Sequence, residues 1–160
     1  MIYRAALATI FVFLLSCSKS PFPDPDFEHC VEVNKYDKNT DYHELTLLVC
    51  DGMEIADLEG IQEMKLLETV KLRENFIRNI GPLADLKKLK HLELQDNYLT
   101  IEDLDVLSQL TALEYLNIDD NCLNGPVDKE QEVFDKIHAS NPSIEIDGNA
   151  LSMKTSEECK

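Results

Sequence analysis

A spaced pattern of aliphatic residues and asparagine recurs along this chain, and it constrains the fold more than any other feature of the sequence. Successive copies lie about 22 residues apart, and the spacing then lengthens to about 24 and about 28 residues. The full copies contain Leu67, Val70, Leu72, Asn75, Ile77; Leu89, Leu92, Leu94, Asn97, Leu99; and Leu113, Leu116, Ile118, Asn121, Leu123. A fainter copy consists of Leu45, Leu48, Cys50, Met53, Ile55, and a truncated one of Ile144, Ile146, Asn149, Leu151. One copy cannot bury its own aliphatic side chains, so the copies must stack, and the terminal ones must act as caps.

Within each copy, aliphatic residues alternate with polar ones, as in a β-strand that has one buried face. Val70 and Leu72 lie two residues apart and point to one side of an extended strand, while Lys71 and Arg73 point to the other. A parallel sheet buried on both faces would read as a continuous apolar run. The alternation therefore predicts a sheet with one face in solvent. An asparagine at each strand exit can pair with buried backbone groups of the neighbouring coil.

Residues 67–88, with the sequence LETVKLRENFIRNIGPLADLKK, resemble the leucine-rich repeat of about 22 residues found in internalins. The IGPL step at residues 80–83, followed by Leu86, is typical of that class, and the resemblance covers roughly residues 45–151. It implies an α/β solenoid, a right-handed coil with a short parallel β-sheet on the concave face and short helices or turns on the convex face. It also implies a protein ligand, and internalins as a class indicate adhesion to host or neighbouring cells.

The N-terminus has the pattern of an export signal. Arg4 supplies a positive charge, and the apolar stretch of residues 5–15 is too short to span a bilayer as a mature helix. The sequence LLSC at residues 14–17 resembles the bacterial lipobox. We therefore expect residues 1–16 to be a lipoprotein signal peptide and Cys17 to carry the lipid. The alternative is ordinary secretion, with cleavage shortly after that cysteine.

The segment that follows is rich in proline, which predicts an extended tether over residues 17–29. We expect the leucine-rich repeat domain over residues 30–160, with an N-terminal cap at about 30–44 and a C-terminal cap at about 125–160. By analogy with enteric bacteria, the serine after the lipidated cysteine favours the outer membrane. The expected location is the bacterial cell envelope, facing the periplasm or the cell surface, and the alternative is a secreted protein.

Two further segments predict helices on the convex side and at the C-terminal end. Thr100 followed by Asp103 resembles a capping box before leucines at helical spacing. Residues 127–140 place Val133, Phe134 and Ile137 on one face, and this longer helix accounts for the stretched spacing before the last copy.

The chain is strongly acidic, with a formal net charge of −16. Removal of residues 1–16 would take away one basic residue, Arg4, and no acidic one. This charge disfavours nucleic acid and anionic lipid headgroups as ligands, so membrane contact is expected through the lipid anchor only. A partner chosen by charge would be a basic protein ligand or a cation. The alternative is that the charge only keeps an exported domain soluble.

The cysteines are consistent with export. A lipidated Cys17 leaves four others, an even number, as expected in an oxidising compartment. Because stacked coils contact only their neighbours, pairing within each end of the solenoid is easier than pairing across it. We expect a disulfide between Cys30 and Cys50 and another between Cys122 and Cys159. The competing interpretation makes Cys50, at a core position, a buried free thiol.

The solvent-facing positions of the strands are the expected binding surface. Adjacent strands lie about 4.8 Å apart, so successive rows form one continuous face. The alignment of the copies places Ser143, Glu145 and Asp147 beside Tyr115, Asn117 and Asp119. Tyrosine and arginine often anchor protein ligands, although the same face could be a merely solvated one. The expected partner-binding residues are Lys71, Arg73, His91, Glu93, Gln95, Tyr115, Asn117, Asp119, Glu145 and Asp147.

Catalytic and metal-binding interpretations are weak. His29, Cys30, His43 and Cys50 lack the paired short spacings of a zinc site. The segment of residues 147–158 resembles a calcium loop only faintly, because an aliphatic residue replaces an oxygen ligand. The chain also has no nucleophile elbow and no phosphate-binding glycine loop. We expect no enzymatic activity, no cofactor and no metal.

Three hypotheses follow from the sequence. The leading one is a lipid-anchored leucine-rich repeat protein that binds a protein partner through its concave face. The second is a structural envelope lipoprotein that faces the periplasm. The third, a small metal-dependent enzyme, has the least support.

Overall fold

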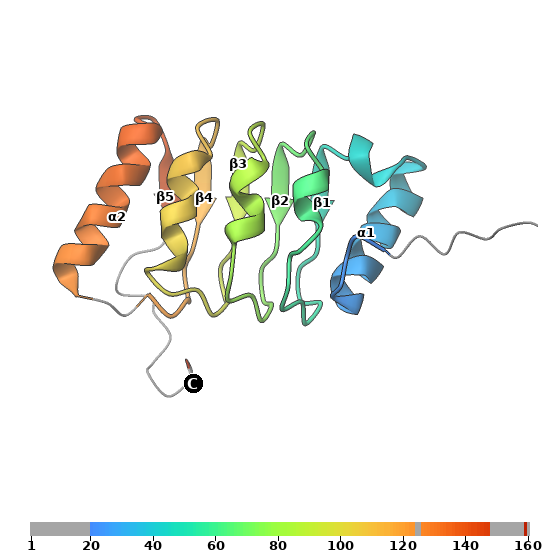
Figure 1. The fold of residues 1–160 in the computed structure, drawn as a ribbon, viewed down its shortest axis with the longest axis horizontal. Coiled ribbons are helices and arrows are strands. Elements are labelled where there is room, and N and C mark those ends of the chain that lie inside the picture. Colours follow the sequence, from blue (N-terminus) through green and yellow to red (C-terminus); the bar gives the residue numbers. More distant parts are fainter. Residues whose placement is uncertain (1–19, 124–125, 148–158, 160) are drawn as a thin grey trace, which may run out of the picture.

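The computed structural model describes residues 20–123, 126–147 and 159. Five parallel strands form one sheet in the order β1-β2-β3-β4-β5, and each strand pairs with the next in the sequence. Figure 1 shows the strands in one row, with α1 and α2 at opposite ends of it. The helices are α1 (Pro25–Lys38), η1 (Tyr42–Glu44), η2 (Ile61–Glu63), η3 (Gly81–Asp85), η4 (Asp103–Gln109) and α2 (Val127–Ser140), where η marks a 3-10 helix. The strands are β1 (Leu47–Val49), β2 (Thr69–Lys71), β3 (His91–Glu93), β4 (Tyr115–Asn117) and β5 (Glu145–Asp147).

The repeated aliphatic residues form one continuous core, as the spacing predicts. The central residues of the strands lie in register across the whole sheet, and those of the first four are fully buried. These residues are Leu48, Val70, Leu92, Leu116 and Ile146. The leucines and isoleucines of the convex turns pack against them from the other side of each coil. The chain therefore has the predicted solenoid with a parallel sheet on one face.

The buried asparagines of the repeat join neighbouring coils through hydrogen bonds, and we call them the asparagine ladder. Asn97 is fully buried, and its Oδ1 accepts a hydrogen bond of 3.0 Å from the Ile77 backbone amide of the preceding coil. Its Nδ2 donates to the carbonyls of Leu72 at 2.8 Å and Leu94 at 3.0 Å. Asn75 and Asn121 make the equivalent contacts one coil earlier and one coil later. Backbone groups that the coil would otherwise leave buried and unpaired are satisfied in this way.

The convex elements are short 3-10 helices rather than α-helices. A single coil of about 22 residues leaves room for one tight turn between strands, and 3-10 geometry suits such short pieces. The expected contact between Thr100 and Asp103 is present, because Asp103 Oδ2 accepts from the Thr100 amide at 2.8 Å and its hydroxyl at 2.7 Å. Helix η4 then begins at Asp103 itself.

The N-terminal cap begins earlier than the sequence predicts. Part of the expected extended tether, residues 20–29, is folded: α1 starts at Pro25, and Phe22 and Phe27 are buried in the core. Proline is well tolerated in the first helical turn, and Asp24 caps it by accepting from the amides of Asp26 and Phe27. The tether prediction is therefore wrong for this stretch. The remaining tether residues, 17–19, lie outside the described part of the chain.

Asp24 also ties the cap to the first coil. Its Oδ2 accepts hydrogen bonds of 2.9 Å from the backbone amides of Ala56 and Asp57. Burial works against the charge, but the hydrogen bonds from Phe27, Ala56 and Asp57 outweigh it and lower the pKa of Asp24. One ionised carboxylate thus joins two segments that lie more than 30 residues apart in the sequence.

Helix α1 covers the β1 edge of the sheet (Figure 1). The Asn34 side chain accepts from the Val49 amide at 3.2 Å and donates to the Val49 carbonyl at 3.1 Å. A disulfide joins Cys30 of this helix to Cys50, directly after β1. A second disulfide joins Cys122 to Cys159. These are the two pairings that the sequence favours, and the free-thiol interpretation of Cys50 is excluded.

The C-terminal cap contains the predicted helix. Helix α2 packs against η4, with Val133 and Ile137 buried and Phe134 partly buried against the core. Among the described residues no helix is long and apolar enough to cross a membrane. The expected signal peptide, 1–16, and Cys17 lie outside them.

The register of the last strand differs from the predicted one by two residues. Leu116 pairs with Ile146 rather than with Ile144, so Tyr115 lies beside Glu145 and Asn117 beside Asp147. The Ile144 amide donates to a carbonyl three residues earlier, as Leu113 does in the preceding repeat. Ile144 therefore fills the first leucine position of the last repeat, with one residue fewer before the strand than in the other copies.

Candidate functional site

The structure brings the predicted partner-binding residues to one side of the sheet. One row of paired positions contains Leu47, Thr69, His91, Tyr115 and Glu145, and the next contains Val49, Lys71, Glu93, Asn117 and Asp147. Arg73, Gln95 and Asp119 follow β2, β3 and β4 by two residues, so they continue the same alternation. We call this surface the concave face.

Glu93 lies at the centre of the concave face and contacts three neighbouring side chains of that face. Its Oε1 accepts from Lys71 Nζ at 2.6 Å and lies 2.7 Å from His91 Nε2, while its Oε2 lies 3.5 Å from Arg73 Nε. The sequence predicts a solvated carboxylate here, but Glu93 is only 8% exposed because these neighbouring side chains cover it. Burial opposes its ionisation, yet the hydrogen bonds from Lys71 and His91 prevail, and the pKa of Glu93 lies below its usual value.

The basic row of the concave face is neutralised by neighbouring acids. Arg73 donates to a single oxygen, Asp51 Oδ2, from Nη2 at 2.7 Å and from Nε at 3.0 Å, and this pair raises the pKa of Arg73. The Asp51 Oδ1 also accepts from the Arg73 backbone amide at 3.0 Å. Asp51 was not among the expected partner-binding residues. Its position two residues after β1, matching Arg73 after β2, is the sequence signal that identifies it.

An aromatic pair continues the network toward the C-terminal end. The rings of His91 and Tyr115 stack with centroids 4.4 Å apart and planes 15° apart. The Tyr115 hydroxyl donates to Asp147 Oδ2 at 2.7 Å, and this hydrogen bond raises the pKa of Tyr115. Contacts thus run from Lys71 through Glu93, His91 and Tyr115 to Asp147, and this order across four strands fixes the shape of the face.

Gln95 supplies an unsatisfied acceptor on the same face. Its Oε1 is buried and has no hydrogen-bond partner among the described residues. Asn117, by contrast, is satisfied locally, since its Oδ1 accepts from the Asp119 amide at 3.0 Å. A buried acceptor without a donor is uncommon in proteins.

The metal-site interpretations gain no support from the geometry. Cys30 and Cys50 are joined by a disulfide, so they have no thiolates left for a zinc ion with His29 and His43. Within residues 20–123 and 126–147, and at 159, no group of three or more histidine, cysteine or acidic side chains could hold a metal ion. The faint calcium-loop resemblance falls mostly on residues outside this part of the chain.

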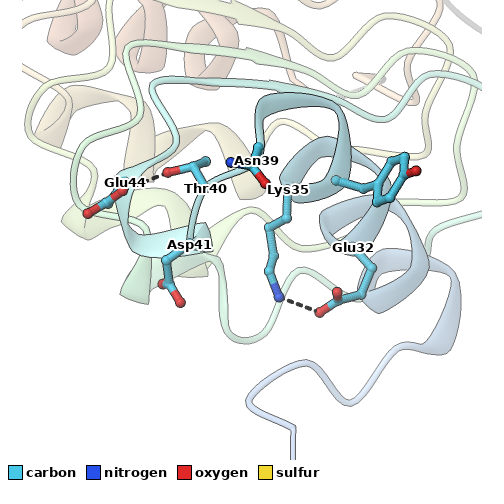
Figure 2. Close-up of a pocket in the computed structure, with 7 residues that line it drawn as sticks. Glu32, Lys35, Asn39, Thr40, Asp41 and Glu44 are labelled. Carbon is cyan, nitrogen blue, oxygen red and sulfur yellow. Dashed lines mark hydrogen bonds and ion pairs between the residues drawn. The ribbon is translucent and has the colours of Figure 1, made fainter.

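A separate depression of about 780 Å³ lies on the N-terminal cap, between α1 and η1 (Figure 2). Its polar groups are occupied locally. Lys35 Nζ donates to Glu32 at 2.7 Å, and the Thr40 hydroxyl donates to Glu44 at 2.6 Å. Asp41 caps η1 by accepting from the amide of His43. These contacts give the depression a structural part in ordering the cap.

Comparison with known proteins identifies the repeat. Residues 65–123 match the family model described as "Leucine rich repeat". A solved internalin (inlF) from Listeria monocytogenes is 30% identical with a TM-score of 0.58, over 63% of this chain and 31% of that one. The functional domain of InlJ from the same species, described as including a cysteine ladder, is 27% identical with a TM-score of 0.63. That match covers 82% of this chain and 27% of the InlJ chain.

A match to a curated protein is shorter. An uncharacterized protein of Caenorhabditis elegans is 35% identical over 71 residues, which are 44% of this chain and 15% of that protein. The chain therefore spans less than a third of each of these three proteins. The matches share the repeat region, and the repeat architecture is what they have in common with this chain.

Proposed function

We propose that this chain, a leucine-rich repeat protein with internalin-like structural neighbours, binds a protein partner through its concave face. The observation that carries the proposal is the network centred on Glu93. It fixes Lys71, His91 and Tyr115 in one arrangement before any partner arrives. A preorganised surface loses little side-chain entropy on binding, and leucine-rich repeat folds typically act as non-enzymatic interaction scaffolds.

The chemistry of the face indicates what the partner presents. Val49 is 39% exposed at one end, whereas Glu145 and Asp147 are exposed at the other. A partner segment with an apolar end and a basic or donor-rich end would match this order, and Tyr115 would be its central anchor.

The proposal includes export and a lipid anchor on Cys17. The export pattern of residues 1–16 and the two disulfides support it, because disulfides persist in oxidising compartments. Several acyl chains would make membrane attachment long-lived. The protein would then act at the bacterial cell envelope, and adhesion is the role that its internalin likeness favours.

A crosslinking assay on intact cells tests the binding proposal. The tagged full chain is crosslinked to the cells, and the variant Tyr115→Ala is compared with Tyr36→Ala. Tyr36 is a matched control because it lies on α1 and the residue is 88% exposed. We expect Tyr115→Ala to weaken capture of one crosslinked species roughly ten-fold or more, and Tyr36→Ala to leave it unchanged. Equal capture by both variants would refute a concave binding face.

A second experiment tests the anchor and its orientation. Metabolic labelling with a fatty acid should mark the wild-type chain and not Cys17→Ser, and label on the serine variant would refute the anchor. Protease treatment of intact cells then separates the two orientations. Loss of the domain without lysis indicates surface display, and protection indicates the periplasm.

A further inference from the structure

The hydrogen-bond partners of His91 assign a tautomer to its imidazole ring. Its Nε2 lies 2.7 Å from Glu93 Oε1, which also accepts from Lys71 Nζ at 2.6 Å. Glu93 is ionised at neutral pH because its pKa lies below the usual value, and a carboxylate only accepts hydrogen bonds. The Nε2 atom of His91 therefore carries a proton. In the neutral ring the lone pair then lies on Nδ1, which makes Nδ1 a hydrogen-bond acceptor.

This acceptor is accessible to a ligand. The His91 side chain is 35% exposed. Within residues 20–123 and 126–147, no hydrogen bond to Nδ1 is formed, and Nδ1 is not one of the buried atoms that lack a partner. The contacts of His91 with its neighbours therefore occupy Nε2 and one face of the ring, and they leave Nδ1 in contact with solvent.

Two contacts fix the direction in which Nδ1 points. The imidazole stacks on the Tyr115 ring, with centroids 4.4 Å apart and planes 15° apart, and the Tyr115 hydroxyl is held in turn by Asp147 at 2.7 Å. The bond from Nε2 to Glu93 opposes rotation of the imidazole within that stack. The acceptor is therefore oriented before a partner arrives, so binding to it costs little side-chain entropy.

The surroundings of Nδ1 favour a donor in the partner over an acceptor. The positive charges of Lys71 and Arg73 are paired with carboxylates of the same face. On the other side of His91, Glu145 lies beside Tyr115 in the sheet and is exposed. A partner carboxylate or carbonyl would meet a lone pair at Nδ1 and negative charge beyond it, whereas an N–H or O–H group is complementary to both.

We propose that His91 Nδ1 is the acceptor by which the concave face selects its partner, and that the partner presents an N–H or O–H donor at this point. The inference rests on the proposed concave binding face and specifies what the partner presents at its centre. Glu93 is the positioning residue, because it fixes the tautomer of His91. A partner group without a proton to donate would leave Nδ1 desolvated and unpaired, which is unfavourable.

The first test needs no partner. Long-range proton–nitrogen NMR spectra of the isotope-labelled, disulfide-bonded full chain in a non-ionic detergent distinguish a protonated imidazole nitrogen from one with a lone pair. The variant His91→Asn identifies the His91 signals by their loss. At about pH 8, above the ordinary pKa of a histidine of about 6.5, we expect a proton on Nε2 and a lone pair on Nδ1. A protonated Nδ1 at this pH would overturn the inference.

The second test compares two variants in the crosslinking assay on intact cells. His91→Asn places a side-chain oxygen near the position of Nδ1, whereas the longer side chain of His91→Gln reaches toward Glu93 and leaves no acceptor there. Both variants lose the ring that stacks on Tyr115, so the difference between them measures the contribution of the acceptor. The matched control is His138→Gln, at an exposed position of α2.

We expect His91→Gln to capture the crosslinked species about ten-fold more weakly than His91→Asn, and His138→Gln to match the wild type. Equal capture by the two His91 variants, with capture still reduced in Tyr115→Ala, would overturn the inference and leave the proposed function intact. Equal capture by Tyr115→Ala and Tyr36→Ala would instead refute the proposed function, and the inference with it. Circular dichroism checks the fold of each variant, and the NMR result decides should a His91 variant unfold.

Discussion

Asn97 offers the sharpest test of how the coils are held together. Replacing it with alanine leaves the Ile77 amide with no partner in a fully buried position. An orphaned buried donor costs about 1–3 kcal/mol. The carbonyls of Leu72 and Leu94 each lose one donor but keep another from Asn75 or Asn121, at about 0.5–1.5 kcal/mol each.

The sum predicts a loss of about 2–6 kcal/mol in the free energy of unfolding. For a domain of this size, that loss lowers Tm by on the order of 10 °C. Urea unfolding followed by far-ultraviolet circular dichroism, with the disulfides intact, measures it. Asn117→Ala is the matched control, since this half-buried asparagine makes a local contact to the Asp119 amide and should cost less than about 1 kcal/mol.

Asn97→Asp separates the donor from the acceptor role. Aspartate can still accept from the Ile77 amide. At neutral pH, however, it places a negatively charged carboxylate oxygen against the carbonyl oxygens of Leu72 and Leu94, which repel it. We expect it to be at least as destabilising as alanine at pH 7. If Asn97→Ala lost no more stability than Asn117→Ala, the ladder would not hold the coils together and the reasoning would be wrong.

Three further predictions concern the network and the N-terminal cap. Because the pKa of Glu93 is lowered in the folded state, its contribution to stability is complete above the usual glutamate value near ~4.5 and is lost as pH falls through the lower folded value. As pH is lowered from about 7 to about 3, the free energy of unfolding should therefore fall more for the wild type than for Glu93→Gln. Parallel plots of this free energy against pH would show that the network around Glu93 does not stabilise the fold. Gly60→Ala should destabilise by about 2 kcal/mol or more, since a Cβ there would lie 2.6 Å from the Phe22 ring at a φ of 99°. Gly52→Ala, with a φ of 64° and open space, should cost only about 1 kcal/mol in the same thermal melts, and equal losses would contradict the packing of Phe22. Asp24→Asn should lower the free energy of unfolding, measured in urea at pH 7, by about 0.5–2 kcal/mol. The difference in this free energy from the wild type should shrink as pH falls through the lowered pKa of Asp24. A difference that does not change with pH would show that the charge of Asp24 is unimportant.

The central repeats could be predicted from the sequence because their physics is local and periodic. Each aliphatic pair at a spacing of two residues fixes one strand face, and each asparagine marks a strand exit. Helix α2 was equally predictable, since Val133 and Ile137 share one face between two proline-containing boundaries. The cysteine pairs follow from the rule that coils contact only their neighbours.

Other features depend on tertiary contacts that a pattern does not encode. Ile144 and Ile146 each fit the strand position, and only the pairing with Leu116 decides between them. The prolines near Asp24 suit an extended segment as well as a helix start. The burial of Phe22 in the core favours the folded cap, in which a helix starts after Asp24. The position of Glu93 on the concave side was predictable, but its burial was not, because the long side chains of the adjacent strand cover it.

The contact between Asn34 and Val49 has a consequence for assembly. The outermost strand of a sheet normally offers free amides and carbonyls on which a foreign strand can nucleate. Here a side-chain amide from α1 already occupies one such pair, at 3.2 Å and 3.1 Å, and the Cys30–Cys50 bridge fastens that helix in place. End-to-end joining of two sheets at this strand is therefore disfavoured, because a foreign strand would have to displace both the Asn34 side chain and the helix that carries it.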